Sequence, residues 1–271
     1  MKVFTMVKGE NDIVEDWVLY HGHMFGFRNI YVIDNFSLDG TYESLLMLKK
    51  KYGINVTRLP NYKQKGFYMT SLLKTFCINE LAFPIDIDEF IVYYNKPSNT
   101  ISCDKNLILN HIQSLPKIPI YKMNYINVKN FHPEGYARAT VETKRGSYSD
   151  YATMAKTFFH SALFRGTIDH GNHYNTNSYL LTSLCLVHFH QRNLDQIKKK
   201  VYNNVTGLGY SPFNLQLLMN LKNKGSGVIG YHHVDKQIKI LNKTFKLDVD
   251  EQNPSDISLE PLNTTLINLK P

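Results

Sequence analysis

The first 95 residues alternate between short apolar runs and amphipathic segments, and this alternation limits the possible folds more than any other feature. Strands are expected at residues 3–7, 29–33, 54–59 and within 81–94, and helices at 11–25, 39–52 and 67–80. Gly26 and Gly53 follow two of these helices, where glycine commonly ends a helix. A βαβαβαβ order requires crossover helices between parallel strands, so we predict an α/β fold: a mostly parallel central sheet with helices on both faces.

The remainder of the chain has a weaker pattern. Helices are expected at residues 104–115 and 194–205, extended segments at 118–128 and 179–190, and a loop or hairpin at 130–150. The last residues are acidic and poor in aromatic side chains, so this tail is either disordered or docked elsewhere. We therefore divide the chain into residues 1–95, residues 96–247, which complete the same domain, and an acidic tail at 248–271.

The charge of the chain is positive but does not favour nucleic-acid binding. Its 31 cationic residues outweigh 23 acidic ones by 8, yet only 6 of the cations are arginine. Nucleic-acid readers prefer arginine for bidentate contacts, and the chain has neither a basic–aromatic repeat nor zinc-ligand spacing. The densest run, Lys198 to Lys200, lies beside an apolar helical stripe and is best explained as a solvated helix face. A non-catalytic nucleic-acid- or nucleotide-binding protein is kept as the alternative function.

Composition also indicates the cellular compartment. Three scattered cysteines indicate a reducing environment without a disulfide framework. No run of about 18 apolar residues is present, so no transmembrane helix is expected. The N-terminus reaches a charge too soon for a signal peptide. We expect a cytoplasmic protein, and its lysine excess allows contact with an anionic membrane surface.

Polar side chains follow four consecutive strands of the predicted sheet. Parallel α/β sheets bind ligands outside the carboxyl ends of their strands, so these side chains are expected to line one crevice. They are Lys8 and Glu10 after the first strand, Asp34, Asn35 and Asp39 after the second, Lys63, Gln64 and Lys65 after the third, and Asp86, Asp88 and Glu89 at the fourth. Asp34 ends a buried strand and needs a hydrogen-bond donor, which a base or ribose would supply.

The sequence IDIDEF at residues 85–90 indicates a metal site. In an extended strand, Asp86 and Asp88 project from one side, and two adjacent carboxylates repel unless a cation lies beside them. Mg²⁺ or Mn²⁺ fits such oxygen ligands and commonly shares its coordination with a substrate phosphate. The alternative is a structural Asp pair that caps the next turn.

Histidines supply the second part of this prediction. Five of the eleven lie between residues 160 and 190: His160, His170, His173, His188 and His190. A mixed carboxylate and imidazole shell suits Mn²⁺. His188 is the first choice as a metal ligand beside Asp88, and His190 and His170 come next. Each histidine taken singly is better explained as an ordinary hydrogen-bonded core or surface residue, whereas that explanation is less attractive for all five together.

Two stretches together resemble the nucleotide-sugar glycosyltransferases of family 2 and family 92 type. They are TMVKGENDIVEDWVLYHGHMFGFRNIYVIDNFSLDGT at residues 5–41 and IDIDEFIV at 85–92. The matching positions are Lys8, Glu10, Glu15 or Asp16, Trp17, Tyr20, His21, Gly26, Asp34, Asn35, Ser37, Asp39, Gly40, Thr41, Asp86, Asp88, Glu89 and Phe90. The resemblance continues into Lys156, His170 and residues 186–201. Gly9 departs from the pattern, which has Asn there.

The resemblance implies a GT-A type fold in which residues 1–95 bind a nucleotide-sugar donor and residues 96–247 form the acceptor side. Asp34 and Asn35 with the first strand's loop (Val7, Lys8, Glu10) would hold the base, and Asp86 would contact the ribose. Asp88 and a late histidine would hold Mn²⁺ on the diphosphate. Gln64 would also contact the donor, and Lys63 or Lys65 would stabilise the leaving diphosphate.

The implied reaction transfers a sugar, with a UDP-sugar as the expected donor, to a hydroxyl of a glycan or lipid-linked acceptor in polysaccharide assembly. An inverting enzyme needs a carboxylate base near the acceptor hydroxyl. Asp169 is the first candidate, with Glu142 and Asp150 as rivals. A phosphohydrolase with a D-x-D motif is disfavoured, because Phe90 stands where those enzymes need a small hydroxylated residue.

Overall fold

The computed structural model describes residues 1–150, 155–174, 176–228 and 230–270. The strands are β1 Lys2–Val7, β2 Ile30–Asp34, β3 Asn55–Arg58, β4 Leu81–Pro84, β5 Glu89–Asn95, β6 Thr100–Ser102, β7 Ile120–Val128, β8 Arg145–Ser149, β9 Lys156–His160, β10 Leu180–His188 and β11 Ile257–Ser258. The helices are α1 Val14–Phe25, α2 Thr41–Tyr52, α3 Lys65–Phe76, α4 Lys105–Ser114, α5 Ala139–Glu142, α6 Leu194–Gly207, α7 Leu215–Asn223, α8 Tyr231–Leu241 and α9 Glu260–Leu269.

The strands form one sheet in the order β3-β2-β1-β4-β9-β7-β10-β5-β6, with β8 paired to β7 and β11 paired to β8. Strands β3, β2, β1 and β4 are parallel, because each is followed or preceded by a crossover helix. The second half adds the parallel pair β7–β10 and the antiparallel neighbours of β4, β7 and β10. The predicted α/β class, with a central sheet between helices, is confirmed.

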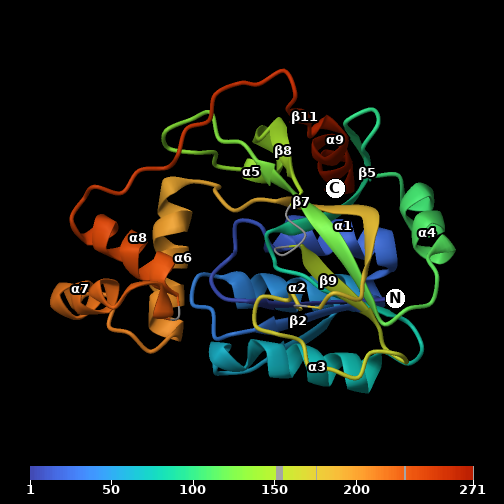
Figure 1. Ribbon diagram of the computed structural model, residues 1–271, viewed down its shortest axis with the longest axis horizontal. Helices are drawn as coiled ribbons and strands as arrows, with labels where there is room; N and C mark the ends of the chain where they lie inside the picture. Colours follow the sequence, from blue (N-terminus) through green and yellow to red (C-terminus); the bar gives the residue numbers. More distant parts are fainter. Residues whose placement is uncertain (151–154, 175, 229, 271) are drawn as a thin grey trace.

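Helices cover both faces of this sheet (Figure 1). Strand alternation sends Val3 and Val7 of β1 to the face covered by α1, α2, α4 and α9, whereas Phe4 and Met6 face α3. These two apolar layers bury the sheet on both sides. They hold the carboxyl ends of the parallel strands at one edge.

Helices α6, α7 and α8 pack mainly on one another through a third apolar cluster at one end of the molecule (Figure 1). We call residues 194–247 the helical unit. The acidic tail returns from it across the sheet, and Leu262 and Leu266 of α9 join the main core beside α1. The tail is therefore docked rather than disordered.

The structure corrects one expectation that matters for the site. Residues 81–94 do not form one strand: β4 ends at Pro84, β5 begins at Glu89, and Asp86 and Asp88 lie in the turn between them. The amide of Glu89 donates to the carbonyl of Asp86 at 3.1 Å, and Trp17 Nε1 donates to the same carbonyl at 3.1 Å. The two carboxylates are placed by this turn and not by strand alternation.

Other differences between the expected and the observed elements are smaller. Helix α1 begins at Val14 rather than residue 11, and the strand expected at 179–190 ends at His188. Strand β9 and helices α7 and α8 were not predicted. β9 has only five residues and carries no alternating pattern, so only its pairing with β4 and β7 defines it.

Candidate active site

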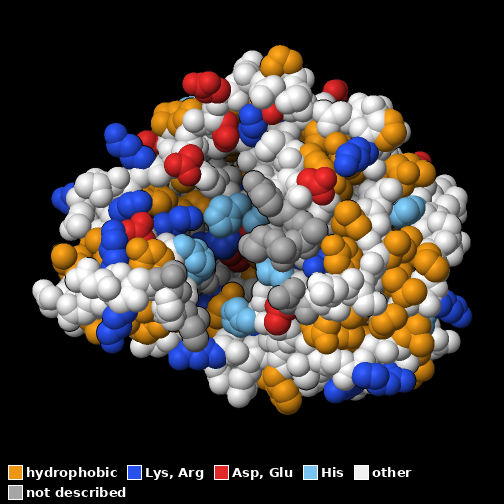
Figure 2. Space-filling model, in the orientation of Figure 1, with side chains coloured by type: hydrophobic (Ala, Val, Ile, Leu, Met, Phe, Trp, Pro, Cys, Tyr) orange, Lys and Arg blue, Asp and Glu red, His pale blue; other side chains and the backbone are white. Residues whose placement is uncertain are grey.

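Two cavities open at the strand ends, the smaller one against the helical unit and the larger one against the start of the C-terminal tail. The larger has a volume of about 610 Å³ and the smaller about 220 Å³. Both are lined by Asp86, His188 and His190, so these three side chains stand at the boundary between the cavities. Figure 2 shows the hollow near the centre of this face, with histidines around it and charged side chains deeper inside.

Asp88, His188 and His190 form a group that could hold a metal ion. One ligand atom from each lies within 4.8 Å of the others. Antiparallel pairing of β10 with β5 places His188 opposite Glu89, and the amide of Phe189 donates to the carbonyl of Asp88 at 2.8 Å. These backbone contacts fix the turn and the end of β10 relative to each other.

The protonation states of this group suit a divalent cation. Burial lowers the pKa of His190 to about 2, so its imidazole is neutral and has a lone pair to donate. Burial alone would raise the pKa of Asp88, but Lys200, His188 and Arg192 hold it well below its usual range. His188 Nε2 lies 3.6 Å from Asp88 Oδ2. One carboxylate and two imidazoles are ligands that Mn²⁺ accepts, whereas Ca²⁺ prefers oxygen alone.

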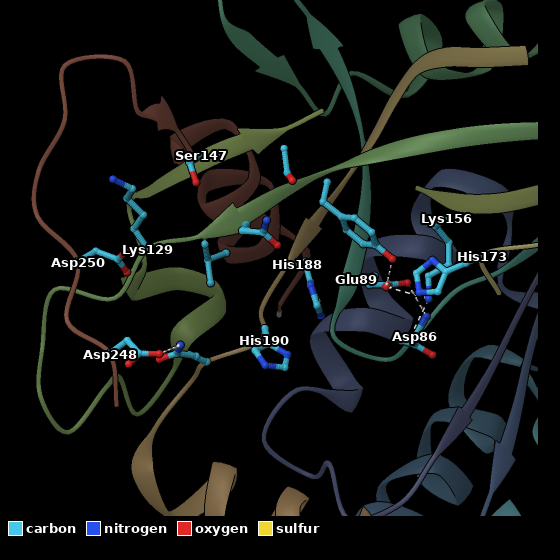
Figure 3. A pocket seen from close by; sticks show the side chains of 15 residues that line it. Asp86, Glu89, Lys129, Ser147, Lys156, His173, His188, His190, Asp248 and Asp250 are labelled. Atoms are coloured by element: carbon cyan, nitrogen blue, oxygen red, sulfur yellow. Dashed lines mark hydrogen bonds and ion pairs between the residues drawn. The ribbon is translucent and has the colours of Figure 1, made fainter. Parts of the chain in front are cut away.

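Asp86 and Glu89 are joined by a buried lysine. Lys156 Nζ lies 2.8 Å from Asp86 Oδ2 and 3.0 Å from Glu89 Oε1 (Figure 3). Lys65 pairs with the other oxygen of Asp86, and Tyr125 donates to Glu89 at 3.1 Å. Burial would lower the pKa of Lys156, but the carboxylates of Asp86 and Glu89 raise it well above its ordinary value. The ammonium is therefore charged and fixes both acids.

Arg192 neutralises the acids beneath the smaller cavity. Its side chain is buried, pairs with Glu10, and lies 2.7 Å from Asp12. Gln196 Nε2 also donates to Glu10 at 3.0 Å. Burial raises the pKa of Glu10, and Arg192 opposes that rise. This network joins the start of α6 to the loop after β1.

Most of the predicted donor residues lie on the smaller cavity. They are Val7, Lys8, Glu10, Lys65 and Asp86, together with the predicted metal ligands Asp88 and His188. Lys63 and Gln64 are exposed: Lys63 lines a separate cavity with His170, and Gln64 accepts from the hydroxyl of Tyr68 at 3.0 Å.

Asp34 and Asn35 have partners within the protein. Arg58 Nε lies 2.9 Å from Asp34 Oδ2, and Asn35 Nδ2 donates to the carbonyl of Leu59 at 2.9 Å. Arg58 also stacks over Tyr42, 4.2 Å from the ring centroid. The amide of Ser37 donates to the Asp34 carboxylate at 3.2 and 3.3 Å, and Arg58 neutralises its charge, so groups of the protein itself take the place that was expected for a ligand. Neither residue is among the described lining residues of the two cavities, so their contact with a base stays a prediction.

The three candidate bases lie apart from the described walls of both cavities. Asp169 accepts from the amide of His173 at 3.1 Å, and Glu142 accepts from the amide of Arg138 at 3.2 Å. Asp150 is exposed and lies 3.6 Å from Lys96. Their catalytic role stays a prediction.

Several lining residues were not predicted as site residues. Figure 3 shows Asp248 and Asp250 on the C-terminal segment, across the larger cavity from Asp86, Glu89, Lys156 and His173. Gln191 Nε2 donates to Asp248 at 3.1 Å and the amide of Asn130 to Asp250 at 2.8 Å. The spacing of the two aspartates was a signal for a shared role, but the tail position hid it.

No family model and no curated protein matches the chain. Among solved structures, the chain aligns with residues 1–349 of S. aureus TarS at 13% identity and a TM-score of 0.36, covering 90% of this chain and 71% of that one. The complex of TarS with UDP-GlcNAc gives 12% identity, a TM-score of 0.40, and coverage of 90% and 72%. The complex with UDP gives 12% identity, a TM-score of 0.35, and coverage of 89% of this chain and 71% of that one. At such low values these similarities carry no argument, and the site is judged from its own residues.

Within the described ranges of the chain, no helix has both the length and the apolar character needed to cross a membrane.

Proposed function

We propose that the protein is a glycosyltransferase that uses a divalent cation, Mn²⁺ or Mg²⁺, to move a sugar from a nucleoside diphosphate sugar to a hydroxyl. One observation carries the proposal: the group Asp88–His188–His190 stands where two cavities meet. A transferase needs two substrates on either side of one reacting bond, and this arrangement provides two spaces at one charged boundary. The sequence resemblance supports the same conclusion.

The smaller cavity suits the donor. Its walls combine the acids of the metal group with the basic or amide side chains Lys8, Lys65, Lys200, Asn203 and Asn204. These side chains can donate hydrogen bonds to the oxygens of a diphosphate, and the carboxylates can bind a cation that the diphosphate also binds. We propose a UDP-sugar as the donor. Asp86, the acid nearest to Lys65 and Lys156, would face the ribose.

The larger cavity suits a polyhydroxylated acceptor. Tyr125 offers an aromatic face, and Asn127, Ser147, Ser149, Asp248 and Asp250 offer hydrogen-bonding groups. Sugars are commonly bound by such a mixture of ring faces and polar groups. A glycan or lipid-linked saccharide is therefore the proposed acceptor. A cytoplasmic location beside a membrane surface belongs to the same proposal.

The chemistry would be displacement of the nucleoside diphosphate from the anomeric carbon by the acceptor oxygen. A cation at Asp88, His188 and His190 would act as a Lewis acid that stabilises the negative charge of the leaving group. Lys65 and Lys156 hold Asp86 in place, so this carboxylate moves little when the donor binds. An inverting reaction requires a base on the acceptor side. Asp169, Glu142 and Asp150 remain the proposed candidates, and Asp248 and Asp250 are added because they line the larger cavity.

A panel of nucleotides and nucleotide sugars, with and without Mn²⁺, tests the proposal by thermal shift. A ligand that binds only the folded protein, at a free concentration 100 times its Kd, stabilises the protein by about 2.7 kcal/mol. We expect a nucleoside diphosphate sugar to raise the melting temperature more with Mn²⁺, and to release the nucleoside diphosphate when an acceptor is added.

The variant Asp88→Asn should lose the dependence on Mn²⁺. Asp195→Asn, which changes an exposed acid on α6, should keep it. If no nucleotide shifts the melting temperature, the proposed function is wrong. If a nucleotide binds but no sugar is ever released, the alternative of a non-catalytic nucleotide-binding protein is favoured.

A further inference from the structure

The helical unit carries almost all of the excess positive charge of the chain. Residues 194–247 contain nine lysines and two aspartates, a net charge of +7, against +8 for the whole protein. Figure 2 shows lysines gathered over α6 and α8 beside the central hollow. One of them, Lys200, lines the smaller cavity and pairs with Asp88. A charge excess this local favours anionic ligands at this end of the molecule.

Helix α6 is held firmly against the loop after β1. Gln196 Nε2 donates to the carbonyl of Gly9 at 3.0 Å, and Asn203 Nδ2 donates to the carbonyl of Lys8 at 3.2 Å. Residues 196, 200 and 203 share one face of the helix, so Lys200 is fixed between these two anchors. Gly9, whose φ is +69°, lies beside this contact, and a Cβ there would lie 2.6 Å from Asn203 Nδ2 and push that amide aside.

We propose that Lys200 changes partners during the catalytic cycle. In the free protein its ammonium neutralises Asp88. When a divalent cation binds Asp88, His188 and His190, the ammonium turns to the diphosphate of the donor. This inference rests on the proposed function and deepens it.

The first half of the exchange follows from a shared oxygen. Asp88 Oδ2 is the atom that Lys200 contacts and that lies 3.6 Å from His188 Nε2. A cation bound through this oxygen would lie at close range to the ammonium, and like charges at such distances repel strongly in a buried site. Lys200 and the cation therefore compete for one carboxylate.

The second half follows from the surroundings of Lys200. The acids of the helical unit are already paired: Asp195 with Lys198, and Asp235 with Lys222 and Lys239. The other two acids that line the smaller cavity are also paired: Glu10 with Arg192, and Asp86 with Lys65 and Lys156. A displaced ammonium at this wall has phosphate oxygens as its natural partner.

Neighbouring side chains fit the same ligand. Asn203, Asn204, His232 and His233 line the cavity beside Lys200. His233 Nε2 meets Asn204 at 3.1 Å, while its buried Nδ1 has no hydrogen-bond partner within the described chain. Buried polar atoms are rarely left unpaired, so this atom marks a place for a ligand oxygen or water.

The exchange makes two predictions of opposite sign for Lys200→Met. Without nucleotide, the variant should bind Mn²⁺ about tenfold more tightly, because the competing ammonium is gone. With saturating Mn²⁺, it should bind UDP about tenfold more weakly, because one cation on the diphosphate is lost. Free Mn²⁺ is counted by its EPR signal and UDP binding by calorimetry. Lys198→Met, an exposed lysine two residues away on the same helix, should change neither affinity by more than about twofold.

Each outcome decides between the possibilities. If Lys200→Met weakens the binding of both Mn²⁺ and UDP, Lys200 has a structural role and the exchange is wrong. If the variant binds both as the wild-type protein does, the exchange is also wrong. Lys200→Gln is a second variant should Lys200→Met fold poorly, and circular dichroism monitors folding of both. Wild-type protein that binds no nucleoside diphosphate refutes the proposed function and the exchange together. Wild-type protein that binds UDP while both variants bind Mn²⁺ and UDP unchanged refutes the exchange alone.

Discussion

Lys156→Met should destabilise the protein by removing the cation that two buried acids share. Lys156 and Glu89 are each about 1% exposed, whereas the side chain of Asp86 is 33% exposed and keeps Lys65. Removing one partner of a buried ion pair costs about 3–5 kcal/mol. We expect the lower end, about 3 kcal/mol, because Glu89 retains hydrogen bonds from Tyr125 and from the amide of Asp86.

Urea unfolding measures this loss, and a double variant tests its cause. For a chain of this size, about 3 kcal/mol corresponds to roughly 6–12 °C in melting temperature. Replacing Glu89 as well, in Lys156→Met/Glu89→Gln, removes the uncompensated charge and should recover about 1–3 kcal/mol relative to the sum of the single variants. A Lys156→Met protein within about 1 kcal/mol of the wild type, or a double variant with no recovery, would refute the claim that charge pairing, rather than packing, fixes these acids.

Three further predictions address the core, the α6 contact and the metal group. Burial lowers the pKa of His21 from 6.5 to about 3, so its neutral ring contributes fully to folding stability above pH 6.5, and this contribution is lost as the pH falls toward 3. Between pH 6 and 4, the free energy of unfolding measured with urea should therefore change by about 1.4 kcal/mol less per pH unit in His21→Gln than in the wild type. An unchanged slope contradicts this. Gly9→Ala should cost about 1 kcal/mol more than Gly53→Ala, since both glycines have positive φ but an added Cβ at Gly9 would displace the Asn203 amide from the carbonyl of Lys8. Equal losses would show that this hydrogen bond does not hold α6 against the loop. Asp88→Asn should abolish Mn²⁺ binding in calorimetry while circular dichroism stays native, and retained affinity would remove Asp88 from the metal group.

The first part of the fold could be predicted because its signals are local. Each strand and helix up to residue 84 is an apolar run or stripe bounded by residues such as Gly26 and Gly53, which end α1 and α2 as expected. The IDIDEF motif at residues 85–90 was predicted to lie in a strand but lies largely in the turn before β5, because Ile85 and Ile87 continue the apolar pattern through that turn. Periodicity alone cannot distinguish a buried turn from a strand.

The site was only partly predictable because its partners are distant in sequence. Asp86 and Lys156 are 70 residues apart, and Asp88 and Lys200 are 112 apart. The late histidines were found through their clustering, whereas Lys156 was singled out only by the resemblance, and nothing in its segment indicated that it would pair with Asp86 and Glu89. Lys200 was assigned to a solvated helix face, which holds for Lys198 beside Asp195 but not for Lys200. Only the docking of α6 on the loop after β1 reveals the difference.

The central claim is that one cation joins Asp88, His188 and His190 to the diphosphate of a donor. Pulsed EPR of Mn²⁺ in the presence of UDP measures this directly, because the ion reports nearby nitrogen and phosphorus nuclei in the same complex. We expect ¹⁴N couplings from two imidazoles, reduced in His188→Ala and in His190→Ala, together with ³¹P couplings from UDP. Bound Mn²⁺ that shows phosphorus without histidine nitrogen, or histidine nitrogen without phosphorus, would contradict it.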